Sequence, residues 1–383
     1  MEIELKKLGE ITTGNTPSKK DESYWDSEDI CFVKPDGIAE EGITIINDSS
    51  EYISENARSK ARVASKDAVF VTCIGSIGKI GIADAGDYAF NQQINVIEPN
   101  ERVLPRYLAY NLLYSKPRLE AIANAPVVPI INKTQFEDFI LSIDEDKTKQ
   151  AEIVSVLDKL VGIIESRKRE LESFDELIKA RFVELFGDLN VNPKGWELKS
   201  FDELTNLITD GEHSTPRRCE EGVYLLSARN VLNHELQLED VDYIDDEEYE
   251  RISKRIIPES GDVLLSCSGT VGRCCCVPEG LKFQMVRSTA LLRFKEELNP
   301  VFAEYMITSD FVQKQIDKAK TASSQANLFQ GKIAKLRGFV PPRELQDEFL
   351  VFAKQVDKSK VAVQKALDES QLLFDSLMQE YFG

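Results

Sequence analysis

The amino-acid sequence predicts an α+β protein with two similar globular units of mixed α/β structure, each followed by one long helix. Three observations support this prediction. Motifs of the first half recur about 195 residues later. Two segments carry apolar residues in alternating steps of four and three, which is the pattern of a coiled coil. The rest of the chain consists mostly of short β-type runs separated by turn residues.

The first globular unit is expected to cover residues 1–144. Short apolar runs at 30–33, 43–46 and 68–74 are rich in β-branched and aromatic residues, and Gly, Asn, Asp and Pro separate them. Such runs are typical of strands joined by turns. A short helix is expected over 105–113, where a proline opens an apolar stretch. The unit is therefore predicted to be a mixed α/β domain.

The first long helix is expected within residues 145–188, with Gly187 just past its end, where glycine is favoured. Its heptad seam has ten positions, of which eight are apolar and two are arginine (Arg167 and Arg181). The apolar positions predicted to pair with another helix are Ile153, Leu157, Leu160, Ile164, Leu171, Phe174, Ile178 and Leu185.

The second globular unit is expected over residues 189–342. It follows a linker at 188–195, and the prolines Pro341 and Pro342 close it. Its run Cys274-Cys275-Cys276 lies in an apolar stretch that is predicted to be a buried strand. Because neighbouring residues of a strand face opposite sides, the three thiols are interpreted as reduced core cysteines rather than metal ligands.

The second long helix is expected over residues 343–383, and its seam is in the same register as the first. Adding 196 to each position of the first seam gives the second, in which Lys360 and Ser370 are the polar members. A shared register predicts that the two helices pair with each other. The pairing positions named for this helix are Phe349, Val356, Val363, Leu367, Phe374 and Leu377.

The two globular units also repeat short motifs. Residues 67–79 match residues 261–273: both are an apolar strand, two glycines three apart and a cation. Residues 13–20 match 210–218, as small polar loops that end in two cations. The sequences between these motifs differ strongly. One scaffold with two different surfaces suggests two related but non-identical tasks.

Composition restricts the class of protein. The chain of 383 residues has no apolar segment of the length that spans a membrane and no secretory signal, and its seven cysteines have no framework spacing. These features predict a cytoplasmic protein in a reducing compartment. The net charge of −19 counts against a DNA-binding protein that acts alone and without sequence preference. It leaves open a specific one with a local basic groove.

The sequence carries no motif of self-sufficient catalysis. The chain has two histidines, His213 and His234, and nothing in their spacing predicts a metal site. It contains no P-loop, no dinucleotide fingerprint and no nucleophile elbow. The paired glycines are interpreted as a tight turn, with a backbone approach to phosphate as the alternative. No catalytic residue, metal ligand or bound cofactor is therefore predicted.

Binding chemistry is what the polar loops offer. Thr, Ser, Asn, Gln, Arg and Lys can hydrogen-bond base edges and phosphates. For each single residue the alternative is an ordinary solvated surface position, but the paired basic loops recur in both halves. The candidate DNA-binding residues of the first unit are Thr16, Ser18, Lys19, Lys20, Lys34, Lys79, Asn91, Gln92 and Gln93. Those of the second are Ser214, Thr215, Arg217, Arg218, Arg229, Asn230, Arg273, Arg287 and Ser288.

With its order of unit, helix, unit and helix, the chain resembles the DNA-specificity (S, HsdS) subunit of type I restriction–modification systems over essentially its whole length. The motifs that carry the resemblance are the Gly211–Pro216 loop, the strand and turn from Gly261 to Arg273, the Asn192–Trp196 opening and the Pro341–Gln346 start of the last helix. Two differences from the family pattern occur at the chain start and at residues 142–147, where paired prolines are missing.

The resemblance implies that each globular unit is a target-recognition domain for one half of a bipartite site in double-stranded DNA. It also implies that the helices pair antiparallel around a pseudo-twofold axis, set the spacer and dock two methyltransferase (M) subunits. Two motor-nuclease (R) subunits complete such complexes. The chain itself is then not an enzyme and carries no cofactor, and S-adenosylmethionine, ATP and Mg are expected on the partner subunits.

Apolar residues outside the seams are interpreted as docking surface for partner helices, with packing on the globular units as the alternative. They are Val156, Ile163, Leu177, Phe352, Leu372 and Leu373. Two other functions remain open. The chain could be a coiled-coil scaffold that joins two protein-binding modules, or a specificity subunit for methylation or phage defence without a nuclease.

Overall fold

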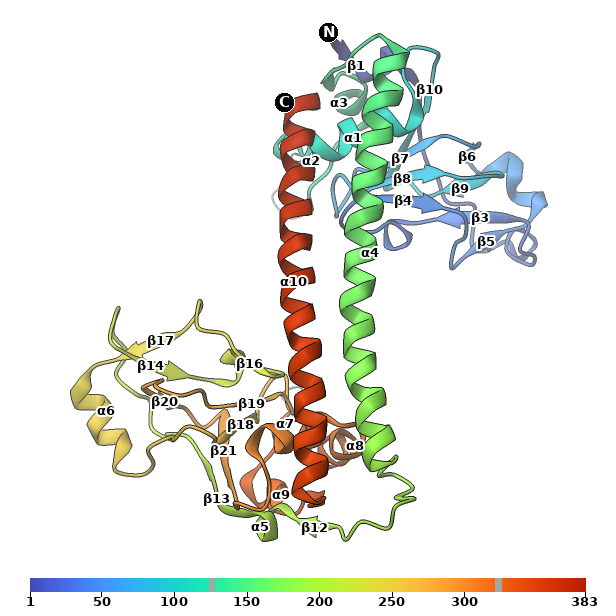
Figure 1. Cartoon of the computed structure of the whole chain (residues 1–383). Coiled ribbons are helices and arrows are strands. Elements are labelled where there is room, and N and C mark those ends of the chain that lie inside the picture. The colour runs from blue at the N-terminus through green and yellow to red at the C-terminus, as the bar shows by residue number, and fades with distance from the viewer. Residues whose placement is uncertain (124–127, 321–325) are drawn as a thin grey trace. The chain divides into compact units, whose positions relative to one another are not determined.

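A computed structural model of the protein describes residues 1–123, 128–320 and 326–383. The chain forms two compact units of mixed α/β structure, one from residues 1–169 with 364–383 and the other from residues 170–363 (Figure 1). Two long helices, α4 (Lys147–Phe186) and α10 (Arg343–Phe382), each contribute a segment to both units. The predicted long helices are therefore present, and α4 starts two residues later than expected.

The first unit contains a five-stranded sheet with mostly antiparallel pairing. Its strands, in spatial order, are β2 (Gly9–Thr13), β10 (Ile94–Pro99), β7 (Val69–Thr72), β8 (Ile80–Ala83) and β4 (Ile43–Ile46). Only the edge pair of β4 and β8 is parallel among these five. The expected strand at 68–74 is shorter, because Cys73 and Ile74 already lead into the following turn.

A second sheet of this unit packs against the first. It has the order β5 (Tyr52–Ile53), β3 (Ile30–Val33), β9 (Tyr88–Phe90) and β6 (Val63–Ala64). Strands β1 (Glu2–Glu4) and β11 (Ile140–Ser142) form a separate antiparallel pair.

Alternate residues of the central strand β7 face two different cores. Val69 and Val71 pack towards the helices, whereas Phe70 packs between the sheets with Phe90. This is the period-two alternation that a sheet buried on both faces requires. The short helices of the unit are α1 (Pro105–Tyr114), α2 (Lys116–Ile122) and α3 (Lys133–Glu137). The predicted helix at 105–113 is thus confirmed as α1.

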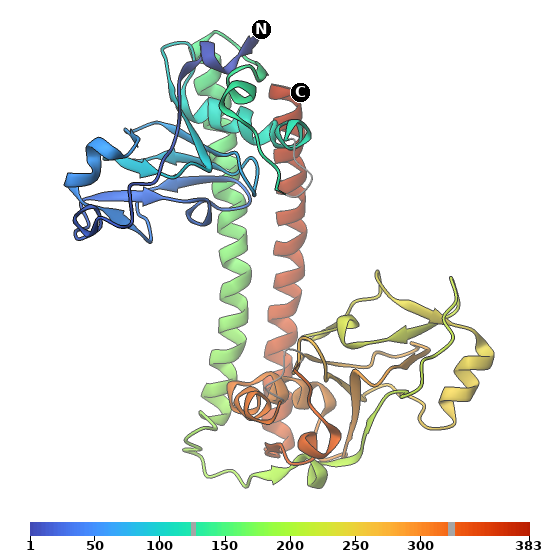
Figure 2. The ribbon, with the colours of Figure 1, turned by 180° about the vertical axis from the view of Figure 1, so that it is seen from behind.

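Within the first unit, both long helices pack on the same core. Leu157 of α4 and Met378 and Phe382 of α10 are buried together with residues of α1 and the five-stranded sheet. The ring of Phe382 lies 5.2 Å from that of Tyr107. The two long helices lie side by side here (Figures 1 and 2). The core of this unit therefore includes the N-terminal part of α4 and the C-terminal part of α10.

The second unit repeats this plan with four strands in its main sheet. Their order is β13 (Thr205–Asp210), β21 (Thr289–Phe294), β18 (Val263–Ser266) and β19 (Cys274–Cys276). A second sheet contains β17 (Asp242–Ile244), β14 (Val223–Leu226) and β20 (Phe283–Met285). Two short pairs are β12 (Lys199–Ser200) with β22 (Arg337–Gly338), and β15 (Val231–Leu232) with β16 (Glu235–Leu236).

The cysteine run behaves as strand geometry predicts. Cys274 belongs to the core under the long helices, and Cys275 belongs to the core between the two sheets. Burial raises the pKa of both thiols. The cysteines of β19 are thus packing residues that point to opposite faces.

Aromatic side chains join the long helices to the second unit. Phe182 and Phe186 of α4 and Phe349 of α10 pack around Phe302 of α7 (Pro300–Thr308), with ring centroids 5.0–6.3 Å from that of Phe302. Figure 2 shows α7 and α8 against the paired helices and the sheets extending away from them. The other helices are α5 (Phe201–Leu204), α6 (Asp246–Ser253), α8 (Asp310–Ala319) and α9 (Gln330–Ile333).

The long helices run antiparallel within the second unit. Arg181 of α4 binds Glu348 of α10 at 2.6 Å, and Asp175, earlier in α4, binds Lys360, later in α10. From one contact to the other, the residue number falls along α4 while it rises along α10. The two helices therefore run in opposite directions. In both units, every predicted seam position is buried or half-buried. The heptad pattern therefore identified the buried stripe of each helix.

The segment expected to be a linker is tied to the end of α4. Gly187 adopts a left-handed φ of 79°, and Leu189 is buried. Lys194 donates to the Leu185 carbonyl at 2.6 Å, and the Trp196 indole donates to the Phe186 carbonyl at 2.7 Å. These bonds satisfy carbonyls that a helix end leaves without partners. Among the described residues, no helix is long and apolar enough to cross a membrane.

Candidate nucleic-acid interface

The repeated glycine motif forms the same hairpin turn in each unit. Between β7 and β8 the Gly78 amide donates to the Thr72 carbonyl at 2.8 Å, and between β18 and β19 Gly272 donates to Ser266 at 3.0 Å. Gly78 and Gly272 both have positive φ, 75° and 98°. A side chain at either position would be strained. The tight-turn interpretation is confirmed.

The cation after each turn has a fixed backbone. The Lys79 amide donates to the Thr72 hydroxyl at 3.0 Å, and the Arg273 amide donates to the Ser266 hydroxyl at 2.9 Å. The side chains then differ. Lys79 is mostly buried and pairs with Glu40 at 2.7 Å, whereas Arg273 has no ion pair among the described residues. Of these two predicted cations, Arg273 is the one with a free charge.

The polar loop that begins each unit is also held in one way. In the first unit Gly14 and Asn15 donate to the carbonyls of Ile94 and Phe90, at 3.1 and 3.0 Å. In the second, the amides of Gly211 and Glu212 donate to Thr289 and Met285, at 3.0 and 2.8 Å. The two loops therefore leave equivalent strands, β2 and β13, at equivalent places.

In the first unit the structure brings two predicted loops together. The Thr16 hydroxyl donates to the Gln92 side-chain carbonyl at 2.8 Å, and both residues are exposed. Ser18 and Lys20 are exposed next to them. Asn91 is buried, and its side-chain amide donates to the Gln93 side chain at 2.9 Å and accepts from the Gln93 backbone amide at 3.0 Å. Asn91 therefore supports the loop, and we leave it out of the proposed contact set.

Lys19 and Lys34 share one carboxylate, which belongs to Glu51. The Lys34 ammonium lies 2.6 Å from Oε1 of Glu51, and the Lys19 ammonium lies 3.6 Å from Oε2. The hydrogen bond with Glu51 raises the pKa of Lys34, and the same bond lowers the pKa of Glu51. Lys19 also lies over the Trp25 ring, 5.2 Å from its centroid.

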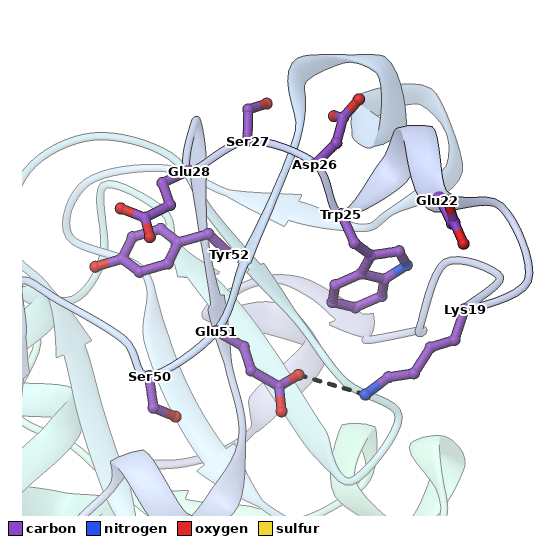
Figure 3. Close-up of a pocket in the computed structure, with 9 residues that line it drawn as sticks. All are labelled: Lys19, Glu22, Trp25, Asp26, Ser27, Glu28, Ser50, Glu51 and Tyr52. Carbon is purple, nitrogen blue, oxygen red and sulfur yellow. Dashed lines mark ion pairs between the residues drawn. The ribbon is translucent and has the colours of Figure 1, made fainter.

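An open pocket of about 640 Å³ adjoins this pair (Figure 3). Lys19 and Glu51 face each other at one side, and Trp25 lies next to them. The rest of the lining includes the carboxylates of Glu22, Asp26 and Glu28. So acidic a lining repels a DNA backbone. The pocket therefore marks the edge of the candidate surface rather than its centre.

In the second unit, acidic residues of α6 hold the polar loop. The Arg217 guanidinium lies 3.0 Å from Glu247, and its amide donates to Glu248 at 3.1 Å. Arg251 of α6 binds Glu248 at 2.9 Å and donates to the Ser214 hydroxyl at 3.2 Å. The predicted residues Ser214 and Arg217 are thus held by charges, while Thr215 remains exposed.

Arg218 and Arg229 share the carboxylate of Asp242, at 3.1 and 3.3 Å. Asn230 is buried, and its amide donates to the carbonyls of Gln237 and Asp240 at 3.1 and 2.8 Å. Asn230 therefore stabilises its own loop, and it is not among the residues that we propose to contact DNA.

The two remaining candidates of this unit lie side by side in the chain. Arg287 is exposed and has no ion pair within the described part of the chain. The Ser288 hydroxyl accepts from the Ala228 amide at 3.0 Å, so it is engaged locally.

The sequence did not single out the residues that hold the cations. Glu51, Asp242 and Arg251 contact the predicted loops but lie outside the sequence motifs. A single charged residue carries no periodic signal. Only strand pairing, which the sequence does not specify, reveals its neighbours.

Ion pairing explains how an acidic chain carries these cations. The exposed candidates Lys19, Arg217, Arg218 and Arg229 all face carboxylates of their own unit. A guanidinium that uses one edge for a carboxylate still has donors for a phosphate oxygen. The surface can therefore bind phosphate at positions that its carboxylates leave open.

The histidines lie at separate places, and each pairs with a different carboxylate. His213 contacts Asp210 at 2.9 Å, and His234 contacts the buried Glu304 at 2.5 Å. Among the described residues, no group of three or more His, Cys, Asp or Glu side chains is arranged to hold a metal ion.

Comparison with known proteins agrees with the resemblance seen in the sequence. Residues 1–173 match the family described as "Type I restriction modification DNA specificity domain". The chain is 26% identical over 234 residues to the specificity subunit of the type I restriction enzyme MjaIX of Methanocaldococcus jannaschii, covering 56% of this chain and 53% of that protein. It is 31% identical over 109 residues to the HindI specificity subunit of Haemophilus influenzae, covering 28% of this chain and 23% of that one. The chain thus spans about half the length of the first relative.

Two solved structures share the fold. The type I restriction–modification S subunit of M. genitalium has a TM-score of 0.57 at 13% identity, with 100% of this chain and 96% of that chain covered. A chain from a study of complex assembly and conformational transition of the type I R-M system has a TM-score of 0.61 at 15% identity, covering 100% and 97%. The family match, the relatives and the shared fold agree: residues 1–173 match the type I restriction modification DNA specificity domain, and the whole chain is similar in fold to type I restriction–modification specificity subunits.

Proposed function

We propose that the chain reads a split DNA sequence, one half-site with each globular unit, for a type I restriction–modification complex. One observation carries this proposal: the two units repeat the same turn and loop hydrogen bonds but present different exposed side chains. Repeated frames place equivalent loops on equivalent faces of a duplex. Different side chains on those loops select different bases.

The chain contributes recognition, and its partners contribute chemistry. Two methyltransferase subunits would use S-adenosylmethionine, and two motor-nuclease subunits would use ATP and Mg. The relatives' names support this division, because both are specificity subunits of restriction enzymes. Because its proposed ligand is cellular DNA, we propose that the chain acts in the cytoplasm.

The long helices set the distance between half-sites. Each is 40 residues long, which corresponds to about 60 Å of helix. We propose that they pair antiparallel over their length as a coiled coil. The buried seams in both units and the antiparallel contacts in the second support this.

Exposed apolar residues of these helices are the proposed docking positions for methyltransferase helices. Val156, Ile163 and Leu177 of α4 are 41–46% exposed, and Leu372 and Leu373 of α10 are 72% and 51% exposed. Exposed apolar side chains that cluster on helices commonly mark partner surfaces. Phe352 is excluded from this set, because it packs on the core and lies under the Arg181 guanidinium.

Sequencing of modified bases tests the recognition role. The gene and its neighbouring methyltransferase gene are expressed in a host whose DNA lacks the modification, with the methyltransferase alone as the control. We expect one asymmetric, split motif that requires this chain. A genome methylated equally with and without the chain would contradict the proposal.

Lengthening the helices tests the spacer. One heptad is inserted after Glu170 in α4 and one after Val363 in α10, so that both seams stay in register. The added length of about 10 Å should lengthen the spacer by about three base pairs. A methylated motif with the original spacer would contradict a role of the helices in setting the distance.

A further inference from the structure

Glu51 and Asp242 occupy equivalent positions of the two units. In the first unit Tyr52 of β5 pairs with Cys31, the second residue of β3. In the second, Tyr243 of β17 pairs with Tyr224, the second residue of β14. Each carboxylate precedes that tyrosine in the chain. The register of the strands therefore aligns two residues that the sequence alone does not align.

Each carboxylate holds two cations from two different loops. One of these cations is the second residue after the proline of the polar loop, Lys19 in the first unit and Arg218 in the second. The other lies shortly after β3 or β14: Lys34 is the first residue after β3, and Arg229 is the third after β14. The same three-residue arrangement thus recurs on surfaces that otherwise differ.

Stability does not explain the repetition. Exposed ion pairs contribute little to the stability of a fold. The carboxylates are less exposed than most of their cations: the side chains of Glu51 and Asp242 are 33% and 28% exposed, against 67% for Lys19 and 49% for Arg218. Each carboxylate therefore faces two cations, of which Lys19, Arg218 and Arg229 are more exposed than the carboxylate. Lys34 is the exception, at 28% exposed, and Asp36 and Asp240 lie 3.9 Å from Lys34 and 3.7 Å from Arg229.

The two arginines keep N–H donors that do not contact a carboxylate and can bind a phosphate. Arg218 contacts Asp242 through Nε, which leaves both terminal nitrogens available, and Arg229 uses only Nη2 for its carboxylates. Arginine presents five N–H donors in a fixed fork, so a second acceptor can bind the same side chain. In the first unit Lys19 lines the pocket of Figure 3, and its side chain is 67% exposed, so solvent reaches its ammonium.

We propose that Glu51 and Asp242 are positioning residues for DNA. Each sets the separation of two cations that bind backbone phosphates of its half-site, and its negative charge disfavours DNA whose phosphates do not meet that pair. The inference rests on the proposed reading of half-sites. It makes each carboxylate a determinant of specificity although it contacts no base.

Neutral replacement separates this role from a structural one. Glu51→Gln removes the repulsion and frees Lys19 and Lys34 for any phosphate. Binding of unrelated duplex should become about three- to tenfold tighter, with a steeper dependence on salt. The preference for the cognate half-site over a scrambled one should fall about tenfold. Asp242→Asn should do the same for the other half-site only.

The measurement uses the full-length chain in complex with its methyltransferase. Binding is titrated at several salt concentrations on a duplex with the mapped motif and on duplexes with one or the other half scrambled. Matched controls are Asp138→Asn, which removes an ion pair with Lys6, and Asp310→Asn, which removes one with Lys314. Glu51→Asp keeps the charge but shortens the side chain, so it should lower specificity without tightening non-specific binding.

Three outcomes overturn the inference while leaving the proposed function intact. The first is that Glu51→Gln and Asp242→Asn behave like their controls. The second is that they weaken binding to all duplexes equally with a lower melting temperature, which indicates a structural role. The third is that each affects both half-sites. A wild-type complex without sequence preference would instead contradict the proposed function itself.

Discussion

The polar loops of the two units leave equivalent strands but are held by different forces. In the first unit the Asn15 side chain donates to the Lys60 carbonyl at 2.6 Å and accepts from the Arg62 amide at 2.7 Å. In the second, ion pairs with Glu247 and Glu248 of α6 hold Arg217. A neutral hydrogen bond responds little to pH, whereas an ion pair does. The two units therefore share one framework but present loops that differ in their sensitivity to pH.

The frames agree most closely where each unit meets a long helix. The buried Gln150 accepts from the Leu104 amide at 2.8 Å and donates to the Arg102 and Asp144 carbonyls. Gln346, at the same heptad position of α10, accepts from the Asn299 amide at 2.8 Å and donates to two carbonyls in the same way. The attachment of unit to helix is therefore the same in both halves, whereas the exposed loops differ.

Removal of these glutamines should have the largest effect. Gln150→Leu and Gln346→Leu each leave one amide and two carbonyls buried without partners. Each unmet group costs about 1–3 kcal/mol, and with partial relaxation we expect a loss of about 3–5 kcal/mol in the free energy of unfolding. Urea unfolding measures it, with the exposed Gln355→Leu as the control. Equal stability of variant and control would contradict the proposed attachment.

A buried ion pair distinguishes the second frame from the first. Asp262 is 2% exposed and binds Arg293 at 2.7 and 2.8 Å, while the first unit has Ala68 at the matching position. Asp262→Ala should cost about 2–3 kcal/mol, somewhat less than a fully buried pair, because Arg293 can reach solvent.

Limited proteolysis with mass spectrometry locates this loss. Cleavage after Asp262→Ala should increase within the strands of the second unit and stay unchanged in those of the first. Glu259→Ala, which removes an exposed partner of the same arginine, is the control. Equal loosening of both units would show that their stabilities are not separate.

The loop cations should contribute less, and to binding rather than to stability. Replacement of Arg217 and Arg218 by alanine together should weaken binding to the cognate duplex about five- to thirtyfold, or roughly 1–2 kcal/mol, and lower the salt slope by about two. The matched control is Lys314→Ala with Lys318→Ala, on α8. An unchanged salt slope would argue for a surface that binds protein rather than DNA.

The sequence predicted the repeat, both long helices and the buried stripe of each, because heptad spacing is a local signal. It also located the loop cations, since they adjoin recognisable turns. It could not separate exposed from buried amides: Asn91 and Asn230 look like surface residues in the sequence, but strand pairing encloses them. Nor could it find Glu51 and Asp242, whose partners lie in other loops and become neighbours only through the register of the sheets.

The smallest effect should follow the charge of Glu248. Hydrogen bonding to Arg251 lowers the pKa of this carboxyl below its ordinary value of 4.5. A lowered pKa in the folded state means that the ion pair stabilises fully above pH 4.5 and loses its contribution as pH falls through the lower folded value. Glu248→Gln should therefore cost up to about 1 kcal/mol at pH 7. The difference from the parent chain should shrink below pH 4.5. Unfolding measured over this range, with the exposed Glu55→Gln of the first unit as the control, decides whether ion pairs hold the second loop. A difference independent of pH would show that packing, not charge, holds it.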